Sequence, residues 1–299
     1  MNYPSRISDH QIAIFLFHGV TLPVECAVRN YTRKHIERDY FATVLRGLKR
    51  AGTPVSMNDI LNHRELGSPL PPRPFAVTFD DGFRNNLSVA APVLVDEHVP
   101  ATFYISTDFV ERNRMSWIDR IEFAVEQCID AELQLPWGRR RFRGDEERRA
   151  FLSEIRHIVK NDLRIDGEKL ATDVQVQLGV AITYSSSHPL DQKLDWNDVR
   201  TLAAEPLFIV GGHGHSHVIL DSLTDQDLEC ELDTGMRLLQ EKAAIHGPHY
   251  SYPEGMPNCY SARVIDALKR RGVRCCPSAV DGVNDSTADL FHLKRVMVV

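Results

Sequence analysis

The chain has 299 residues, of which 43% are hydrophobic and 25% are charged, and its net charge is -6 at pH 7. This length can bury a sizeable core. The acidic balance excludes the overall basic field with which proteins bind nucleic acid or anionic membranes. No apolar stretch reaches the roughly 18 residues that a membrane-spanning helix needs. We therefore expect a globular protein without a membrane span and without a nucleic-acid partner.

The N-terminal segment and the cysteines bear on the compartment. Residues 1–20 contain a short apolar run, 12–17, without a small-residue cleavage site, so they indicate a first strand rather than a signal peptide. The six cysteines have neither the spacing of a zinc ribbon nor the density of a disulfide scaffold. We expect a cytoplasmic protein with reduced thiols.

Short apolar runs that are typical of strands alternate with helical stretches along the chain. The expected strands are residues 12–17, 75–79, 101–106, 207–211, 249–253, 273–280 and 290–299. The expected helices are residues 39–52, 84–99, 196–205, 223–247 and 261–272. This alternation predicts an α/β fold of about seven parallel strands, arranged as an open sheet or a barrel.

Residues 111–194 interrupt the alternation with charged helical segments and no convincing strand. We expect them to form a helical insertion within a single catalytic domain that spans residues 1–299. In the middle of this block, GRRRFRGDEERRAFLSEIRHIVK, acids stand beside the arginines, which favours a solvated helical hairpin over an anion-binding patch. The insertion is either a lid over the site or an oligomer contact.

Two adjacent carboxylates, Asp80 and Asp81, follow the predicted strand 75–79. Like charges repel, and burying them without a partner costs about several kcal/mol. A divalent cation would relieve this repulsion. The alternative for an isolated Asp-Asp-Gly is a solvated turn, in which Gly82 supplies the tight backbone.

Three histidines follow the predicted strand 207–211, in the segment GGHGHSH. His213 and His217 stand four residues apart, which places both rings on one face of a helical turn and is common for two ligands of one metal. His215 is offset by two residues and is expected to point elsewhere. The carboxyl ends of parallel strands converge on one edge. We expect one carboxylate and two imidazoles to form an open, catalytic type of metal site there.

The segments TFDDGF, GGHGHSHVIL and YSYPEG, in this order, resemble the polysaccharide deacetylases, the NodB-homology domain of carbohydrate esterase family four. The resemblance runs from the first strand to the C-terminus, apart from residues 111–194. It implies a deformed (β/α) barrel and metal-dependent hydrolysis of an N-acyl group, usually N-acetyl, on an amino sugar. By this resemblance Asp81, His213 and His217 are the metal ligands, and Asp80 is the general base.

The chemistry of such a site is consistent with these roles. A metal-bound water is acidified toward neutral pH, and a neighbouring carboxylate that does not bind the metal can take its proton. We expect Zn²⁺ as the cofactor, although iron, cobalt or nickel also suit two imidazoles and one carboxylate.

The chain departs from the family pattern in its third motif, residues 250–255, which lacks the arginine that pairs with the base in many members. Arg295 is expected to take that place. The general acid is either His292, in a late Leu-x-His, or His18, after the first strand. Side chains alternate along a strand, so His292 and Arg295 are not expected to reach the interior together.

The sequence therefore predicts a cytoplasmic metal-dependent deacylase that acts on an N-acylated amino sugar during surface-polysaccharide biosynthesis. Tyr252, Glu254 and His35 are the expected substrate contacts, with a simple turn and a solvated helix approach as the alternatives for Glu254 and His35. The alternative functions are a deformylase or amidohydrolase that cleaves another C–N amide bond, and a sugar-binding relative without turnover. The oligomeric state is left open.

Overall fold

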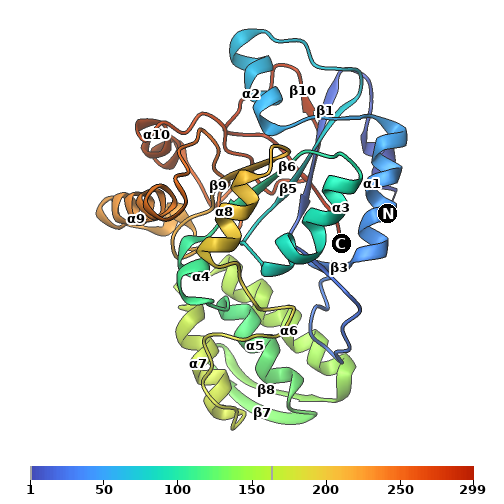
Figure 1. Cartoon of the computed structure of the whole chain (residues 1–299). Coiled ribbons are helices and arrows are strands. Elements are labelled where there is room, and N and C mark those ends of the chain that lie inside the picture. Colours follow the sequence, from blue (N-terminus) through green and yellow to red (C-terminus); the bar gives the residue numbers. More distant parts are fainter. Residues whose placement is uncertain (1, 163) are drawn as a thin grey trace.

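A mostly parallel sheet of seven strands forms the centre of the molecule (Figure 1). This computed structural model describes residues 2–162 and 164–299. The strands are β1 (Gln11–Phe17), β4 (Thr53–Pro54), β5 (Pro74–Phe79), β6 (Ala101–Ile105), β9 (Phe208–Gly212), β10 (Asn284–Asp285) and β11 (Val296–Met297). They follow the order β10-β1-β5-β6-β9, while β11 pairs with β1 and β4 pairs with β5. The pairing of β10 with β1 is antiparallel.

The central strands are buried, as expected for a parallel sheet that is covered on both faces. The register aligns Phe17 of β1 with Phe79 of β5, and Phe79 with Phe103 of β6. Their rings stack, with centroids 5.3 and 5.0 Å apart. The carboxyl ends of these strands therefore lie level with one another at one edge of the sheet.

The last three predicted strands are mostly irregular in the structure, so their predicted extent is wrong. After β9, an isolated parallel bridge joins Gly212 to Tyr250, and another joins His249 to Cys275. The following segments, up to β11, make scattered backbone hydrogen bonds. Pro253 and Pro277 interrupt these segments, and a proline has no N–H with which to extend a ladder.

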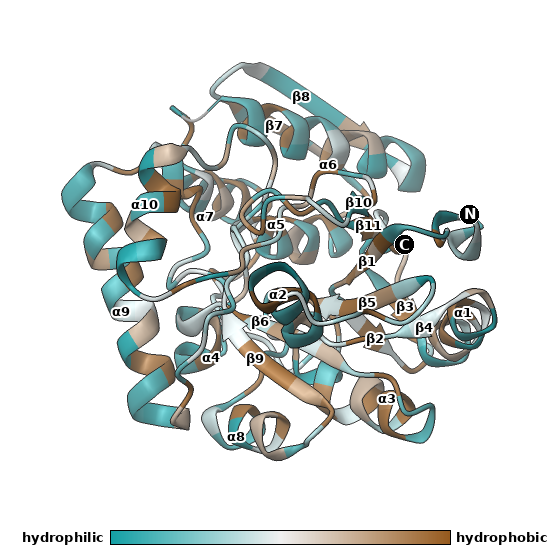
Figure 2. Cartoon of the chain, turned by 90° about the horizontal axis from the view of Figure 1, so that it is seen from above, coloured by the Kyte–Doolittle hydropathy of each residue, from teal (hydrophilic) through white to brown (hydrophobic). Residues whose placement is uncertain are grey.

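Helices pack around the sheet, and Figure 2 shows hydrophobic residues on the strands and hydrophilic outer faces on several helices. These helices are α1 (Arg38–Ala51), α2 (Met57–Leu66), α3 (Ala91–Asp96), α4 (Thr107–Arg112), α8 (Trp196–Ala204), α9 (Asp225–Ala243) and α10 (Ala262–Arg270). The short helical turns are η1 (Tyr3–Arg6), η2 (Asn86–Ala90) and η3 (Leu220–Ser222). Asp195 caps α8 by accepting a hydrogen bond from the Asp198 N–H. Among the described residues, no helix has the length and apolar character needed to cross a membrane.

The insertion forms a separate layer below the sheet in Figure 1. It contains α5 (Trp117–Glu126), β7 (Asp130–Leu135), β8 (Gly138–Arg143), α6 (Gly144–Asn161) and α7 (Gly167–Gln177). Strands β7 and β8 form an antiparallel hairpin, so the expectation of a purely helical insertion is wrong. Leu133, Leu135 and Phe142 alternate with exposed polar residues and enter the insertion's own hydrophobic cluster. Charged outer residues concealed this period of two in the sequence.

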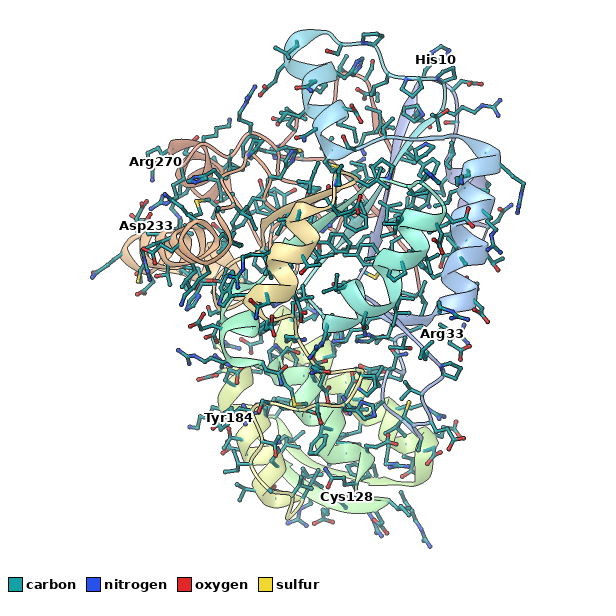
Figure 3. The ribbon with its side chains drawn as sticks, viewed as in Figure 1. His10, Arg33, Cys128, Tyr184, Asp233 and Arg270 are labelled. Carbon is teal, nitrogen blue, oxygen red and sulfur yellow. The ribbon has the colours of Figure 1, made fainter. Side chains whose placement is uncertain are left out.

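Two smaller features complete the fold. A second parallel pair, β2 (Gly19–Thr21) with β3 (His35–Glu37), adjoins the carboxyl end of β1. The six cysteines are free thiols. Cys128 lies in the insertion, like Tyr184, whereas the labelled Asp233 and Arg270 lie on helices α9 and α10, at the left of the sheet (Figure 3).

Candidate active site

Three side chains that could bind one metal ion meet at the carboxyl edge of the sheet. Asp81 follows β5, whereas His213 and His217 follow β9. The Nε2 atoms of His213 and His217 lie 3.6 and 3.1 Å from Asp81 Oδ1. One ligand atom from each of the three residues lies within 4.8 Å of the other two. The two strands thus bring a carboxylate and two imidazoles together across more than 130 residues of sequence.

This donor set fits a divalent cation. Atoms that coordinate one tetrahedral zinc ion, each about 2.1 Å from the metal, lie roughly 3.4 Å from one another. The two imidazole-to-carboxylate distances are close to that value. Three protein ligands leave a position open, which is the arrangement of catalytic rather than structural zinc sites.

The surrounding residues hold both histidines in position. His213 Nδ1 lies 2.9 Å from the Ser251 carbonyl oxygen, which can only accept a hydrogen bond, so His213 donates from Nδ1 and keeps Nε2 free as a ligand. The His217 ring stacks on Phe109 at a centroid distance of 5.4 Å. Asp81 and His217 both adopt positive φ, 78° and 60°. Non-glycine residues in this region are strained, and such strain is concentrated at functional sites.

Asp80 points to the same edge but pairs with a different partner. Arg295 Nη1 and Nη2 donate to Asp80 Oδ1 and Oδ2 at 2.8 and 2.7 Å. The guanidinium also donates to Ser251 Oγ and to the Ser278 carbonyl oxygen. Asp80 Oδ2 lies 3.8 Å from His213 Nε2, which is farther than the 3.6 Å between Asp81 Oδ1 and the same nitrogen. The Asp80 carboxylate thus lies beside the cluster of Asp81, His213 and His217.

The two carboxylates are ionised despite their burial. Burial by itself would raise the pKa of Asp80, but Arg295 and His213 hold it below its usual value. Burial acts in the same direction on Asp81, and His217 and His213 hold its pKa well below the usual range. Arg295 is thus the direct ion-pair partner of Asp80, while Asp81 faces the two histidines, and these contacts relieve the repulsion between the neighbours.

These groups line a cavity of about 300 Å³. Its lining comes from strand ends of the sheet, from the loop before β3, from the insertion and from the C-terminus. The residues are Leu16, His18, Thr32, Lys34, Asp80, Asp81, Ser116, Trp117, Ile118, Arg156, Lys160, His213, His217, Glu254, Met256, Ala279, Met297 and Val299. We call Asp81, His213 and His217 the metal-type cluster. A small ligand in this cavity would contact both this cluster and the insertion.

His18 lies in this cavity at the carboxyl end of β1. Its Nδ1 is buried and has no hydrogen-bond partner among the described residues. Burial lowers the pKa of His18 to about 4, although Asp81 and Asp80 act to raise it. The resting imidazole is therefore neutral near pH 7, and a substrate group that reaches its Nδ1 meets an unused polar atom.

An ion pair and a contact between a cation and a ring join the insertion to the loops beside the cavity. Lys34 lines the cavity and pairs with Asp119 of α5. Lys193 Nζ lies 3.7 Å from the same carboxylate and 3.3 Å from the centre of the Phe83 ring. Burial lowers the pKa of Lys193 to about 8. These contacts fix the insertion against the loops that carry the site.

Glu254 links the same cavity to helix α6 of the insertion. Its carboxylate pairs with Lys160, and its backbone has a positive φ of 60°. Burial acts to raise the pKa of Glu254, but Lys160, His217 and Arg156 lower it to about 2. Glu254 thus lies in the cavity, where a substrate contact was expected, and is ionised at neutral pH.

Three other predicted site residues lie elsewhere. His292 has an exposed side chain 3.4 Å from Asp289, so its placement does not fit a general acid. Tyr252 is buried, stacks on Tyr260 and donates its hydroxyl proton to the Phe291 carbonyl oxygen, so it does not fit a substrate contact.

His35 does not line the cavity either. It is buried against Phe83, and its Nδ1 lies 3.1 Å from Asn85 Nδ2. Its neighbour Lys34, which points into the cavity, occupies the position expected for His35. His215 points away from the cluster, as its offset predicts, and its Nδ1 lies 2.9 Å from Thr107 Oγ1.

Several site residues had no clear signal in the sequence. Ser251 accepts hydrogen bonds from both His213, at its carbonyl oxygen, and Arg295, at its hydroxyl oxygen. Arg156 and Lys160 of α6 reach the cavity, so the interpretation of this stretch as a solvated hairpin is wrong at these two positions. Their spacing of four residues, which puts both on one helical face, was the available signal.

Several solved structures share the fold of this chain. The chain is similar in structure to the Streptococcus pyogenes deacetylase PplD in complex with acetate, at 13% identity and a TM-score of 0.62, with 98% of this chain and 94% of that chain covered. It is also similar to IcaB from Ammonifex degensii, at 17% identity and a TM-score of 0.61, with 98% of this chain and 93% of IcaB covered. The BpsB deacetylase domain from Bordetella bronchiseptica, at 15% identity, has a TM-score of 0.58, with 98% and 97% covered. A search of the curated proteins found no match.

Structural similarity at such low identity shows only a shared fold. Membership of a family is shown by a match of the amino-acid sequence to the family model. The family model described as "Polysaccharide deacetylase" matches residues 67–276, which include β5, Asp80, Asp81, β9 and both histidines of the cluster. The matched segment is more than half of the chain. The protein therefore belongs to the polysaccharide deacetylase family.

Proposed function

We propose that the protein is a metal-dependent deacylase that hydrolyses the N-acyl group, N-acetyl by preference, of an amino sugar. The observation that carries this proposal is that two adjacent aspartates contact different partners. Asp81 faces His213 and His217, whereas Asp80 faces Arg295, and both aspartates line one cavity. One carboxylate is thus available to a cation and the other to a proton.

Asp81, His213 and His217 would hold the cation, with zinc expected from the donor set. When bound, such a cation acts as a Lewis acid, which makes water more acidic and polarises the amide carbonyl. The Ser251 carbonyl keeps the proton of His213 on Nδ1, which directs Nε2 toward the cation site.

Asp80 acts as the general base in this proposal. Its two bonds to Arg295 keep the carboxyl group ionised and fix its orientation, and each oxygen retains a lone pair. Oδ2, the oxygen nearer His213, can then accept the proton that leaves the attacking water. General-base catalysis of this kind contributes roughly 10²- to 10⁴-fold in rate.

We assign the general-acid role to His18 rather than His292, because His18 lines the cavity and His292 is exposed. The resting His18 is neutral. It can therefore donate a proton to the leaving amine only after it has received the proton that Asp80 accepted from the attacking water. The free Nδ1 is the atom available for this transfer.

The test is an assay of acid release from a panel of N-acyl amino sugars by the zinc-loaded protein. We expect acetate from N-acetyl substrates. Formate release from N-formyl sugars in preference to acetate would support the deformylase alternative instead. A protein that retains zinc and hydrolyses no amide would favour a sugar-binding relative without turnover.

The place of the reaction stays a prediction from the sequence. We propose a cytoplasmic intermediate of surface-polysaccharide assembly as the substrate. Fractionation of the native cell, followed by immunodetection, would check the compartment.

A further inference from the structure

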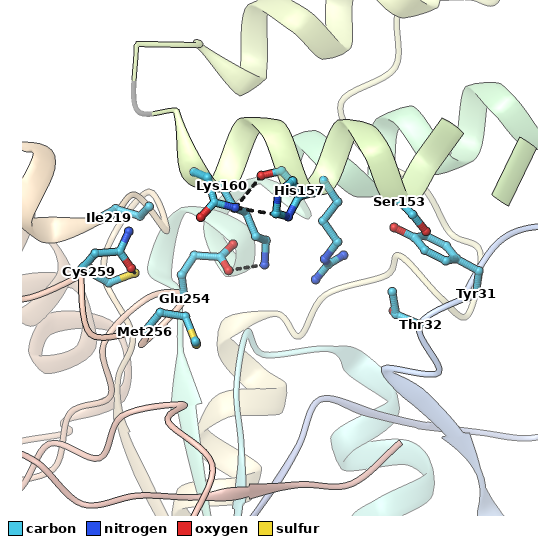
Figure 4. Close-up of a pocket in the computed structure, with 12 residues that line it drawn as sticks. Tyr31, Thr32, Ser153, His157, Lys160, Ile219, Glu254, Met256 and Cys259 are labelled. Atoms are coloured by element: carbon cyan, nitrogen blue, oxygen red, sulfur yellow. Dashed lines mark hydrogen bonds and ion pairs between the residues drawn. The ribbon is translucent and has the colours of Figure 1, made fainter. Parts of the chain in front are cut away.

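A second cavity, of about 420 Å³, adjoins the active-site cavity (Figure 4). The loop before β3, helix α6 of the insertion and the segment after Glu254 form its walls. Its lining residues are Tyr31, Thr32, Ser153, Arg156, His157, Lys160, Asn161, Ile219, Glu254, Met256, Asn258 and Cys259. In Figure 4, Tyr31 and Ser153 lie at one end, Cys259 and Ile219 lie at the other, and the contact between Lys160 and Glu254 lies between them.

The two cavities share one wall. Thr32, Arg156, Lys160, Glu254 and Met256 line both of them. A ligand whose reacting group lies beside the metal-type cluster can therefore extend past this wall into the second cavity. The volume of the second cavity is within the roughly 300–1,000 Å³ that small-ligand pockets occupy.

Arg156, on the shared wall, lies near the Glu254 carboxylate but makes no direct ion pair with it. Its Nη1 is buried, and its guanidinium makes no hydrogen bond or ion pair with any residue that the structure describes. Arg156 as a whole is half-buried, whereas two fully buried arginines are paired directly: Arg120 bonds Glu168, and Arg295 bonds Asp80. A buried charge without a partner is costly, so an unpaired guanidinium indicates that its partner arrives with a ligand.

Other polar groups of the cavity point to the same chemistry. Tyr31 Oη and Thr32 Oγ1 are buried and lack hydrogen-bond partners among the described residues. Lys160 uses one ammonium proton on Glu254 and has others to donate. With Arg156 and Lys160 against the single carboxylate of Glu254, the cavity has an excess of positive charge. Guanidinium, ammonium and hydroxyl donors together match an oxyanion, and phosphate above all.

We propose that the second cavity is a subsite for a phosphate group carried by the amino sugar, with Arg156 as its main ligand. This inference rests on the proposed deacylase function and narrows its substrate to a phosphate-linked amino sugar, in place of a neutral polymer. In a 2-acetamido sugar, a phosphate on the anomeric oxygen lies within about 6 Å of the acyl carbon. At that separation, Arg156, which lines both cavities, can contact the phosphate while the acyl group lies beside Asp81, His213 and His217.

The first test measures binding without turnover. Inorganic pyrophosphate is titrated into the zinc-loaded protein by calorimetry, with wild type, Arg156→Gln, Arg156→Lys and Arg50→Gln compared. Loss of one charged hydrogen-bonding group weakens binding roughly 10- to 100-fold. We expect this loss in Arg156→Gln, partial retention in Arg156→Lys, and wild-type affinity in Arg50→Gln, whose exposed arginine on α1 is remote from both cavities. Pyrophosphate held only by the zinc ion would bind equally to all four proteins, and that result overturns the proposal.

The second test measures substrate preference. The values of kcat/KM are compared for N-acetylglucosamine 1-phosphate and for the neutral methyl glycoside of the same sugar. We expect wild type to prefer the phosphate by at least about tenfold, and Arg156→Gln to lower kcat/KM for the phosphate at least about tenfold more than for the neutral glycoside. An equal loss on both substrates, or no preference in wild type, contradicts the subsite.

Two further substrates distinguish the sources of the phosphate. A nucleoside-diphosphate amino sugar and a polyprenyl-diphosphate amino sugar in detergent are assayed in parallel, and the better substrate identifies the carrier. The outcomes also separate the two proposals. Pyrophosphate binding that depends on Arg156, with no amide hydrolysed, refutes the deacylase function alone. Hydrolysis without phosphate preference refutes the subsite alone.

Discussion

Arg295 and Asp80 are 215 residues apart in the chain and are joined by two parallel hydrogen bonds of 2.8 and 2.7 Å. Both side chains are almost completely buried. The arginine comes from the segment just before β11, and not from the third motif, in which many family members place it. Its position across the sheet edge gives Asp80 a counter-charge that does not compete with the cation site at Asp81.

Asp80→Asn removes the proposed base while it preserves the size of the side chain. We expect kcat to fall about 10²- to 10⁴-fold with the zinc content unchanged, because Asp81, His213 and His217 remain. Elemental analysis and steady-state kinetics check both parts. Full turnover in a zinc-loaded Asp80→Asn protein would show that another group takes the proton.

Arg295→Gln leaves Asp80 buried without its counter-charge. We expect a loss of about 3–5 kcal/mol in the free energy of unfolding, measured by urea denaturation. The pKa of Asp80 should rise, because burial is then opposed only by the weaker effects of His213 and His18, so the acid limb of kcat/KM should move to higher pH. Lys294→Gln, at the exposed neighbouring position, is the matched control and should alter neither quantity.

Removal of the cation tests the three-residue cluster. Dialysis against a chelator should abolish activity, and added zinc should restore it. His213→Ala should lose the metal and the activity together, whereas His215→Ala should keep its zinc, because His215 is turned toward Thr107. Equal zinc content in the two variants would place the cation elsewhere.

The two candidate acids differ in position, and their variants should differ in rate. His18→Gln should lower kcat by about 10²-fold or more, because its imidazole lines the cavity. His292→Gln should leave kcat within about twofold of wild type, because that side chain is exposed and lies beside Asp289. A reversed order would restore His292 as the acid.

His249 provides a test of stability against pH away from the site. Burial lowers the pKa of His249 from 6.5 to about 4, so between these values the unfolded chain binds a proton that the folded chain does not. Folding stability must therefore fall as the pH falls from 7 to 5, by about 2 kcal/mol from this residue. In His249→Gln, urea denaturation at both pH values should show a decline smaller by that amount. An unchanged decline would mean that His249 is protonated in the folded protein.

Much of the site follows from local sequence, because each metal-type residue stands directly after a recognisable strand. The runs that precede Asp80 and His213 form β5 and β9 almost as predicted, and parallel strands bring their carboxyl ends to a common edge. The hairpin β7–β8 was missed because charged residues occupy its outer face and only a few inner positions reveal the alternation.

By itself, the sequence determined the fold class, the family and the residues that gather at the edge of the sheet, since strand periodicity and short motifs are local properties. Only the tertiary structure decided which way the irregular segment near the C-terminus turns, with Arg295 inward on Asp80 and His292 outward in solvent. It also decided that Arg156 faces a cavity rather than bulk water. These outcomes depend on contacts between residues far apart in the chain, and side-chain patterns within one segment do not specify such contacts.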